Sequence, residues 1–237
     1  MNNKVDYRKL RWNNLNSDTF KHLKLLFFWP IFGILFLFVE RFYQVDFYYP
    51  MHCALDDLIP FCEWFLIPYL FWFVYLVGMH LYTLLYDTDA FSRMMKYIIL
   101  TYTAAIIIYF LFPTCQELRP VTFERDNFLT RFIAGFYLFD TNTNVCPSIH
   151  VIGSLAVLEA ALYSKAIPHS KWKAAFVVAA VLICLSTLFM KQHSVLDLLA
   201  AVPICILGHL LYFRRSEKAF HFTAAAPAPD CAESSDV

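Results

Sequence analysis

Two short polar stretches, NVCPSIH at residues 144–150 and KQHSVLD at residues 191–197, decide how this chain is expected to fold. Each stretch directly precedes a long apolar run, so each marks the start of a predicted membrane-spanning helix. Together they carry two histidines, a carboxylate and a cationic side chain. If both helices start at the same edge of a membrane, these groups meet there.

The composition is that of an integral membrane protein. Of the 237 residues, 59% are hydrophobic and 16% are charged, whereas roughly a quarter of a typical soluble domain is charged. The apolar runs leave no room for a separate soluble domain. The formal net charge is zero, so nothing indicates a nucleic-acid partner. Membrane lipids are the expected surroundings, and the sequence leaves open whether the chain forms a homo-oligomer.

Six apolar runs approach the roughly 17–25 residues that a spanning helix needs. The predicted spans are residues 25–42, 64–86, 95–112, 147–164, 174–190 and 194–213. The fourth is short, which slight local thinning of the bilayer accommodates. The expected fold is therefore all-α, an integral membrane bundle of six helices.

The third loop, residues 113–145, is the longest stretch outside the predicted spans. It carries three arginines around a moderately apolar middle at residues 128–139. We interpret this middle as an interfacial or re-entrant helix lying over the end of the bundle.

Lysine and arginine are concentrated in alternate connections, which sets the expected orientation. They occur in residues 1–24, after the second and fourth spans, and after the sixth span. This pattern predicts a cytoplasmic basic segment (residues 1–24), the membrane domain (residues 25–213) and a cytoplasmic, largely disordered tail (residues 214–237). Both polar stretches and the third loop then share the outer face of what we expect to be the plasma membrane.

His193 and Asp197 are spaced four residues apart, which places both on one face of the sixth predicted helix. A carboxylate bonded to one imidazole nitrogen fixes the tautomer and leaves the other nitrogen free as a nucleophile or base. An aspartate inside a membrane helix is costly and is usually functional. The alternative is an interfacial aspartate beside an unrelated histidine.

His150 lies at the start of the fourth predicted helix, with Pro147 in its first turn and either Asn144 or Ser148 as a candidate cap. Backbone N–H groups at a helix start attract anions such as phosphate. His150 could then protonate a leaving oxygen. A lone histidine there is more often a cap or an interface residue, and the pairing with His193 and Asp197 favours the catalytic interpretation.

Arg119 and Lys191 are the cations expected at the same face, and with Ser148 they are the candidate phosphate ligands. An arginine fork binds two phosphate oxygens, whereas a lysine supplies a point charge. Either residue could instead contact lipid headgroups.

The two histidines and the aspartate could also hold a metal ion, or the two histidines a haem. A metal site of two histidines and one carboxylate would lie beside two cations, which oppose a divalent ion. A haem held by both histidines has no other support in the sequence. We expect neither a metal nor a cofactor.

The motif residues resemble the type 2 phosphatidic acid phosphatase superfamily. Residues 146–150 (CPSIH) are similar to its Pro-Ser-Gly-His motif, and Ser186, His193 and Asp197 are spaced as in its Ser-Arg-x5-His-x3-Asp motif. Arg119-Pro120 matches the end of its Lys-x6-Arg-Pro motif. The order of the motifs along residues 25–213 also agrees with the lipid-phosphatase branch.

Three positions depart from those motifs: Phe112 replaces the lysine, Thr187 the arginine and Ile149 the glycine. Such departures also resemble the inositol-phosphorylceramide and sphingomyelin synthase branch, which moves a phospho-headgroup between lipids. The resemblance implies that His193 attacks phosphorus, that Asp197 orients it and that His150 protonates the leaving alkoxide, without a metal.

The sequence therefore supports three functional hypotheses. The first is a lipid phosphatase acting on a phosphatidate-like or isoprenyl diphosphate-like substrate. The second is a phosphotransferase that moves a headgroup to a lipid hydroxyl. The third is a non-enzymatic membrane carrier or interaction protein.

Overall fold

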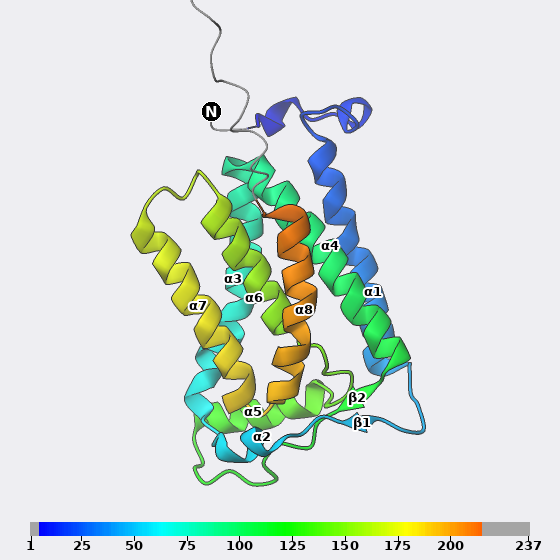
Figure 1. Cartoon of the computed structure of the whole chain (residues 1–237), viewed down its shortest axis with the longest axis vertical. Helices are drawn as coiled ribbons and strands as arrows, with labels where there is room; N and C mark the ends of the chain where they lie inside the picture. Colours follow the sequence, from blue (N-terminus) through cyan, green and yellow to red (C-terminus); the bar gives the residue numbers. More distant parts are fainter. Residues whose placement is uncertain (1–4, 215–237) are drawn as a thin grey trace, which may run out of the picture.

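The computed structural model describes residues 5–214, most of which are helical (Figure 1). Its helices are α1 (Phe28–Arg41), α2 (Ala54–Leu58), α3 (Leu66–Tyr86), α4 (Thr88–Leu111), α5 (Phe128–Phe139), α6 (Ile149–Tyr163), α7 (Ser170–Phe189) and α8 (Val195–Tyr212). Two short strands, β1 (Tyr49–Pro50) and β2 (Thr114–Cys115), pair in parallel. A 3₁₀-helical segment, Lys21–Phe27, leads into α1.

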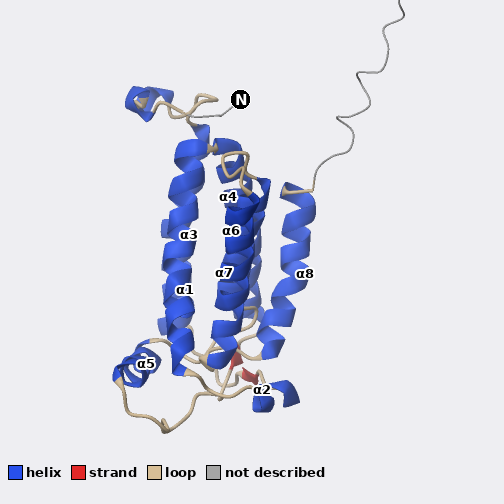
Figure 2. Cartoon of the chain, turned by 90° about the vertical axis from the view of Figure 1, so that its left-hand side faces the viewer, coloured by secondary structure: helices blue, strands red, loops and turns tan. Residues whose placement is uncertain are grey.

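The long helices run side by side in alternating directions, whereas α5 lies across one end of them (Figures 1 and 2). That end also carries α2, β1 and β2, and we call it the site end. The first described residues and the end of α8 both lie at the opposite end (Figure 1). The start of α4, which carries Arg93 and Lys96, and the α6–α7 connection lie there too, so these basic residues group at one end as the charge pattern predicts.

Within residues 5–214, five helical segments are long and apolar enough to cross a membrane. They are Lys21–Arg41, Glu63–Tyr86, Thr88–Leu111, Ser170–Phe189 and Val195–Tyr212. The fourth predicted span, residues 147–164, corresponds to α6, which has 15 residues and is too short to be counted with these five. The predicted tail lies outside the described residues, except for Arg214.

Several boundaries differ from the predicted ones. Helix α4 begins at Thr88 rather than at residue 95, because Asp87 caps it by accepting a hydrogen bond from the backbone N–H of Ala90 (3.1 Å). The charged residues after the second span therefore belong to helix α4 and not to a turn. Helix α2 and the β1–β2 pairing were not predicted. The pairing joins the first loop (residues 42–65, between α1 and α3) to the third loop at the site end. Helix α5 matches the predicted range of 128–139.

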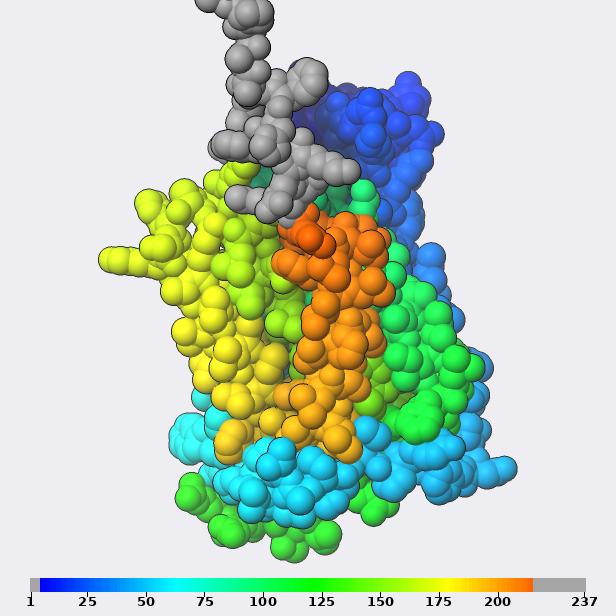
Figure 3. Space-filling model, in the orientation of Figure 1, coloured from blue at the N-terminus to red at the C-terminus, as the bar shows by residue number. Residues whose placement is uncertain are grey.

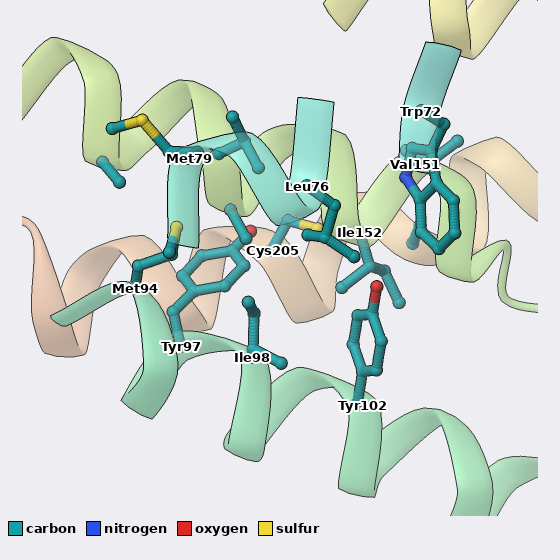
Figure 4. Packing of buried hydrophobic residues seen from close by; sticks show 14 of the residues in the cluster. Trp72, Leu76, Met79, Met94, Tyr97, Ile98, Tyr102, Val151, Ile152 and Cys205 are labelled. Atoms are coloured by element: carbon teal, nitrogen blue, oxygen red, sulfur yellow. The ribbon is translucent and has the colours of Figure 1, made fainter. Parts of the chain in front are cut away.

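Helix α6 lies inside the bundle, in contact with α3, α4, α7 and α8. Figure 4 shows the core that these helices form from Trp72, Leu76, Met79, Met94, Tyr97, Ile98, Tyr102, Val151, Ile152 and Cys205. Gly153 of α6 allows the close approach of α3 and α4, because an added Cβ would lie 2.5 Å from the Tyr102 hydroxyl and 3.0 Å from the Trp72 ring. Gly153 follows His150 by about one helical turn, so this close contact also positions the start of α6, where His150 lies.

The first and third loops cover the site end of the bundle (Figure 3). Ile133 of α5 is fully buried in a second apolar cluster with Leu66, Tyr69 and Met190. Because this cluster joins α5 to the start of α3 and to the end of α7, the third loop is packed beside the α7–α8 turn that carries His193.

Candidate active site

The turn between α7 and α8 fixes the backbone of His193. Lys191 adopts a left-handed conformation (φ 51°). The backbone N–H groups of Gln192 and His193 both donate to the carbonyl of Thr187, at 2.9 and 3.1 Å. These bonds hold the turn tightly against the end of α7.

His193 and Asp197 form the predicted pair. His193 Nδ1 lies 3.0 Å from Asp197 Oδ2, which also accepts a hydrogen bond from the backbone N–H of Ser194 (3.0 Å). Asp197 is fully buried, and His193 is 8% exposed. Because a carboxylate accepts the Nδ1 proton, the Nε2 lone pair of His193 is free to act as a nucleophile.

Thr114 of β2 positions the segment that leads into α6. Its hydroxyl accepts hydrogen bonds from the backbone N–H groups of Val145 and Cys146, each 3.1 Å long. Asn144 precedes them in a left-handed conformation (φ 54°), which asparagine tolerates better than most residues. The Tyr109 hydroxyl donates to the carbonyl of Pro147 (2.7 Å) and anchors the end of the segment.

The start of α6 differs in detail from the sequence prediction. Pro147 precedes the N-cap instead of lying in the first turn, and Ser148 occupies the N-cap position without a side-chain capping bond. The backbone N–H of Ser148 donates to the carbonyl of Asp197 (3.2 Å), which joins the starts of α6 and α8. The fully buried Ser148 hydroxyl has no partner, and Ser148 does not line the cavity described below.

His150 lies between two aromatic rings of α3. The centroid of its ring is 4.6 Å from that of Tyr69 and 4.5 Å from that of Trp72. The His193 ring is 5.9 Å away at an angle of 62°. Both nitrogens of His150 are buried, and neither has a hydrogen-bond partner among the described residues. The rings therefore fix the plane of the imidazole and leave its nitrogens available.

The two histidines line one small cavity at the site end. Its lining consists of Phe36, Glu40, Tyr69, Tyr109, Asp140, Thr141, Thr143, Asn144, Val145, Ile149, His150, Gln192 and His193. The cavity has a volume of about 40 Å³, whereas one water molecule needs roughly 10–15 Å³. It can therefore hold a compact polar group.

Buried polar groups without partners gather around this cavity. Besides both His150 nitrogens, they include the side-chain amide atoms of Asn144 and Nε2 of Gln192. Asn144 and Gln192 are 3% and 2% exposed. Because buried polar atoms in folded proteins are nearly always paired, these groups are available to bond a ligand or water that enters the cavity.

Arg119, a predicted phosphate ligand, does not line this cavity but an adjoining pocket that shares Glu40, Asp140, Thr141 and Thr143 with it. Its guanidinium donates to the carbonyls of Tyr137 (3.1 Å), Asp140 (2.8 Å) and Thr141 (2.9 Å) and to Oε1 of Gln192. It also lies 4.6 Å from the centre of the Tyr137 ring. Arg119 thus ties the end of α5 to the α7–α8 turn.

Lys191 is also directed away from the cavity. Its ammonium group donates to the backbone carbonyl of Asp56 in α2 (2.8 Å). The Asp56 carboxylate in turn accepts hydrogen bonds from the Ser194 hydroxyl (2.6 Å) and the backbone N–H of Val195 (2.8 Å). Helix α2 therefore fastens the start of α8 beside His193, a role that sequence reasoning missed.

We expect Asp56→Asn to lower the thermal denaturation temperature of the detergent-solubilised protein. Asp56 is 2% exposed and also accepts from the backbone N–H of Cys53 (2.8 Å), so either orientation of an asparagine amide sets an N–H group against a donor. Such a mismatch costs about 1–3 kcal/mol. Asp57→Asn is the matched control, because Asp57 is 65% exposed and bonds only to His52. Equal shifts for the two variants would contradict this role of Asp56.

The titration of Asp56 is consistent with this role. Burial raises its pKa, but the hydrogen bonds from Ser194, Val195 and Cys53 outweigh burial and hold the pKa below the ordinary value of 3.8. Its contribution to stability is therefore complete at neutral pH and is lost only as the pH falls below that value.

The electrostatic character of the cavity also differs from the prediction. The carboxylates of Glu40 and Asp140 line it, whereas no lysine or arginine among residues 5–214 does. Burial raises the pKa of Asp140, although Arg119, with Nη2 3.6 Å from the Asp140 carboxylate, opposes that rise. Burial likewise lowers the pKa of Arg119. The donors for an anion in this lining are consequently imidazoles, side-chain amides and the hydroxyl groups of tyrosines and threonines.

Within residues 5–214, no group of three or more histidine, cysteine, aspartate or glutamate side chains is arranged to hold a metal ion. Comparisons with protein families, curated proteins and solved structures give no match to this chain. The family resemblance therefore rests on the motif residues alone.

Proposed function

We propose that this protein is a metal-independent membrane lipid phosphatase that acts through a phosphohistidine at His193. One observation carries the proposal: His150 and His193, far apart in the sequence, line the same small cavity. His193 is oriented by Asp197, and both nitrogens of His150 are unpartnered. A nucleophile, an orienting carboxylate and a proton donor are the groups that phosphoryl transfer through histidine needs.

The proposed reaction has two steps. Nε2 of His193 attacks phosphorus and the bond from phosphorus to the lipid oxygen breaks, while protonated His150 gives its proton to the departing alkoxide. Neutral His150 then takes a proton from a water molecule, which attacks the phosphohistidine. The phosphorus–nitrogen bond breaks, inorganic phosphate leaves, and both histidines return to their starting states.

In this proposal α6 is also counted as a span, which brings the number of spans to six, in a core like that of the type 2 phosphatidic acid phosphatases. Its 15 residues rise about 22 Å, less than the roughly 30 Å of a hydrocarbon core. The neighbouring helices surround it, and the buried residues 144–148 continue the chain towards the site end. The positive-inside pattern then puts both chain ends in the cytoplasm and the cavity near the outer surface of the plasma membrane.

The second candidate is transfer of a phospho-headgroup to a lipid hydroxyl. It is favoured by the carboxylates of Glu40 and Asp140 and by the lack of a lining lysine or arginine among the described residues. A phosphodiester carries one negative charge, whereas a phosphomonoester carries up to two, so a cavity of this kind suits the diester better. An acceptor lipid would then replace water in the second step.

The deciding experiment is a substrate panel with the purified protein. We expect phosphatidate or an isoprenyl diphosphate to release inorganic phosphate in a reaction that EDTA spares and vanadate inhibits. Each lipid, together with a phosphodiester lipid, is assayed with and without ceramide or diacylglycerol. Product that forms only with an acceptor would establish transfer in place of hydrolysis. Activity that is lost with EDTA and restored by a divalent metal would contradict both mechanisms.

A further inference from the structure

Gln192 lies between the partly buried side chain of Arg119 and the cavity. Its Oε1 accepts a hydrogen bond from Nη2 of Arg119, whereas its Nε2 is buried without a partner beside the cavity. An arginine side chain has only donors, so it must face the oxygen of the amide. The amide orientation is therefore fixed, and the NH₂ group is the end left for a ligand.

Arg119 is itself held in place by three carbonyl groups and by the ring of Tyr137. A positively charged donor bonded to Oε1 withdraws electron density from the amide and makes its N–H groups stronger donors. The charge of Arg119 thus reaches the cavity through Gln192, although the guanidinium does not line it.

We propose that Gln192 donates a hydrogen bond from Nε2 to a non-bridging oxygen of the phosphoryl group during transfer to His193, and that Arg119 acts on the reaction by positioning Gln192. Gln192 is then a catalytic residue that touches the reacting group, and Arg119 is a positioning residue. Asn144, whose amide is also unpartnered at the cavity, provides a second neutral donor. This inference rests on the phosphoryl-transfer function proposed above.

The geometry favours a role in the transition state. Gln192 directly precedes the nucleophile, and the backbone N–H groups of both residues share the carbonyl of Thr187. The donor and the attacking nitrogen therefore belong to one rigid turn. Charge on the equatorial oxygens must be stabilised as the leaving bond breaks, and preorganised donors are the usual means.

The informative variant is Gln192→Glu. Glutamate keeps the size of the side chain and an oxygen for Arg119, but it replaces the NH₂ group by a second acceptor. If Gln192 only ties Arg119 to the turn, this variant keeps its activity and is at least as stable as the wild type. If Nε2 binds the phosphoryl group, we expect kcat to fall by about 10²–10³-fold, with little change in the thermal denaturation temperature.

Gln116→Glu is the matched control. Gln116 is also fully buried, its Oε1 accepts from the backbone N–H of Leu118 (2.7 Å), and its Nε2 is also unpartnered. It does not line the cavity. We expect Gln116→Glu to retain wild-type kcat, whatever it does to stability.

Vanadate gives a readout that does not need turnover. We expect vanadate to raise the denaturation temperature of the wild type and of Gln116→Glu, and to do so far less for Gln192→Glu. Arg119→Met should weaken the vanadate response and lower kcat, and Arg119→Lys should restore part of both.

The outcomes separate the two proposals. Full activity and a full vanadate response in Gln192→Glu would overturn the role of Gln192 and leave the phosphatase proposal standing. Inactivity of the wild type on every lipid would overturn the phosphatase proposal. The vanadate response would then decide alone, and equal shifts in the wild type and Gln192→Glu would overturn the role of Gln192.

Discussion

His193→Ala is expected to reduce phosphate release by at least about 10⁴-fold, the order of loss found when a catalytic triad is disabled. The variant lacks the nitrogen that attacks phosphorus. No other side chain that lines the cavity is placed to attack instead. His150 is the nearest imidazole, but its ring is fixed between Tyr69 and Trp72 and has no carboxylate partner among the described residues. Steady-state release of phosphate measures the loss.

Labelling provides an independent measure of the same step. A substrate carrying radioactive phosphate should leave an acid-labile phosphoprotein in the wild type and none in His193→Ala. Asp197→Asn should also lose most of its activity, because an amide can donate to Nδ1 of His193 and favour the tautomer that carries its proton on Nε2. Asparagine keeps the shape of the buried Asp197 side chain, but an amide N–H directed at His193 also faces the backbone N–H of Ser194, so we expect a lower denaturation temperature as well.

His52→Ala is the control for His193→Ala. His52 also forms a histidine–aspartate pair, with Nε2 2.8 Å from Asp57 Oδ1, but its side chain is 51% exposed and lies outside the cavity. We expect this variant to keep full activity. A function that survives His193→Ala would instead point to the third hypothesis, a non-enzymatic carrier or interaction protein.

The length of the apolar runs predicts most of the bundle. In lipid, a single apolar segment can satisfy all its backbone hydrogen bonds only as a helix. The start of α4 was missed because a charged first turn resembles a loop until Asp87 is recognised as an N-cap. Helix α2 and the β1–β2 pairing depend on contacts between loops distant in the sequence, and no local pattern reports those contacts. The sequence predicts that the fourth span is short, and α6 is short. Its place inside the bundle follows from packing alone.

The four-residue spacing predicts the contact between His193 and Asp197, but not its setting: His193 belongs to the α7–α8 turn, before the N-cap Ser194, and only Asp197 lies in α8. The meeting of His193 with His150 also follows from the alternating topology. The roles of Arg119 and Lys191 do not, since a sequence shows that a cation is nearby but not which acceptors it meets first. The sequence did contain a signal for Gln192 as a site residue. It is a polar side chain between Lys191 and the candidate nucleophile His193, at the end of an apolar run.

His150→Gln is expected to slow turnover of a lipid phosphate by about 10²–10⁴-fold, the usual contribution of a general acid or base. The effect should depend on the leaving group. A lipid alkoxide is a strong base and needs a proton as it departs, whereas the nitrophenolate of p-nitrophenyl phosphate departs without one. The first step on the aryl substrate should therefore survive the substitution.

The second step should not survive, since water must still be activated to release the phosphohistidine. We therefore expect His150→Gln to give a burst of nitrophenolate equal to the number of active sites, followed by a slow steady state, and no burst of alcohol from the lipid. His80→Gln is the matched control, because His80 is also buried against an indole ring, that of Trp29 at 5.3 Å, with Nε2 unpartnered, but lies outside the cavity. Equal slowing of both steps on both substrates would show that His150 holds the site together and transfers no proton.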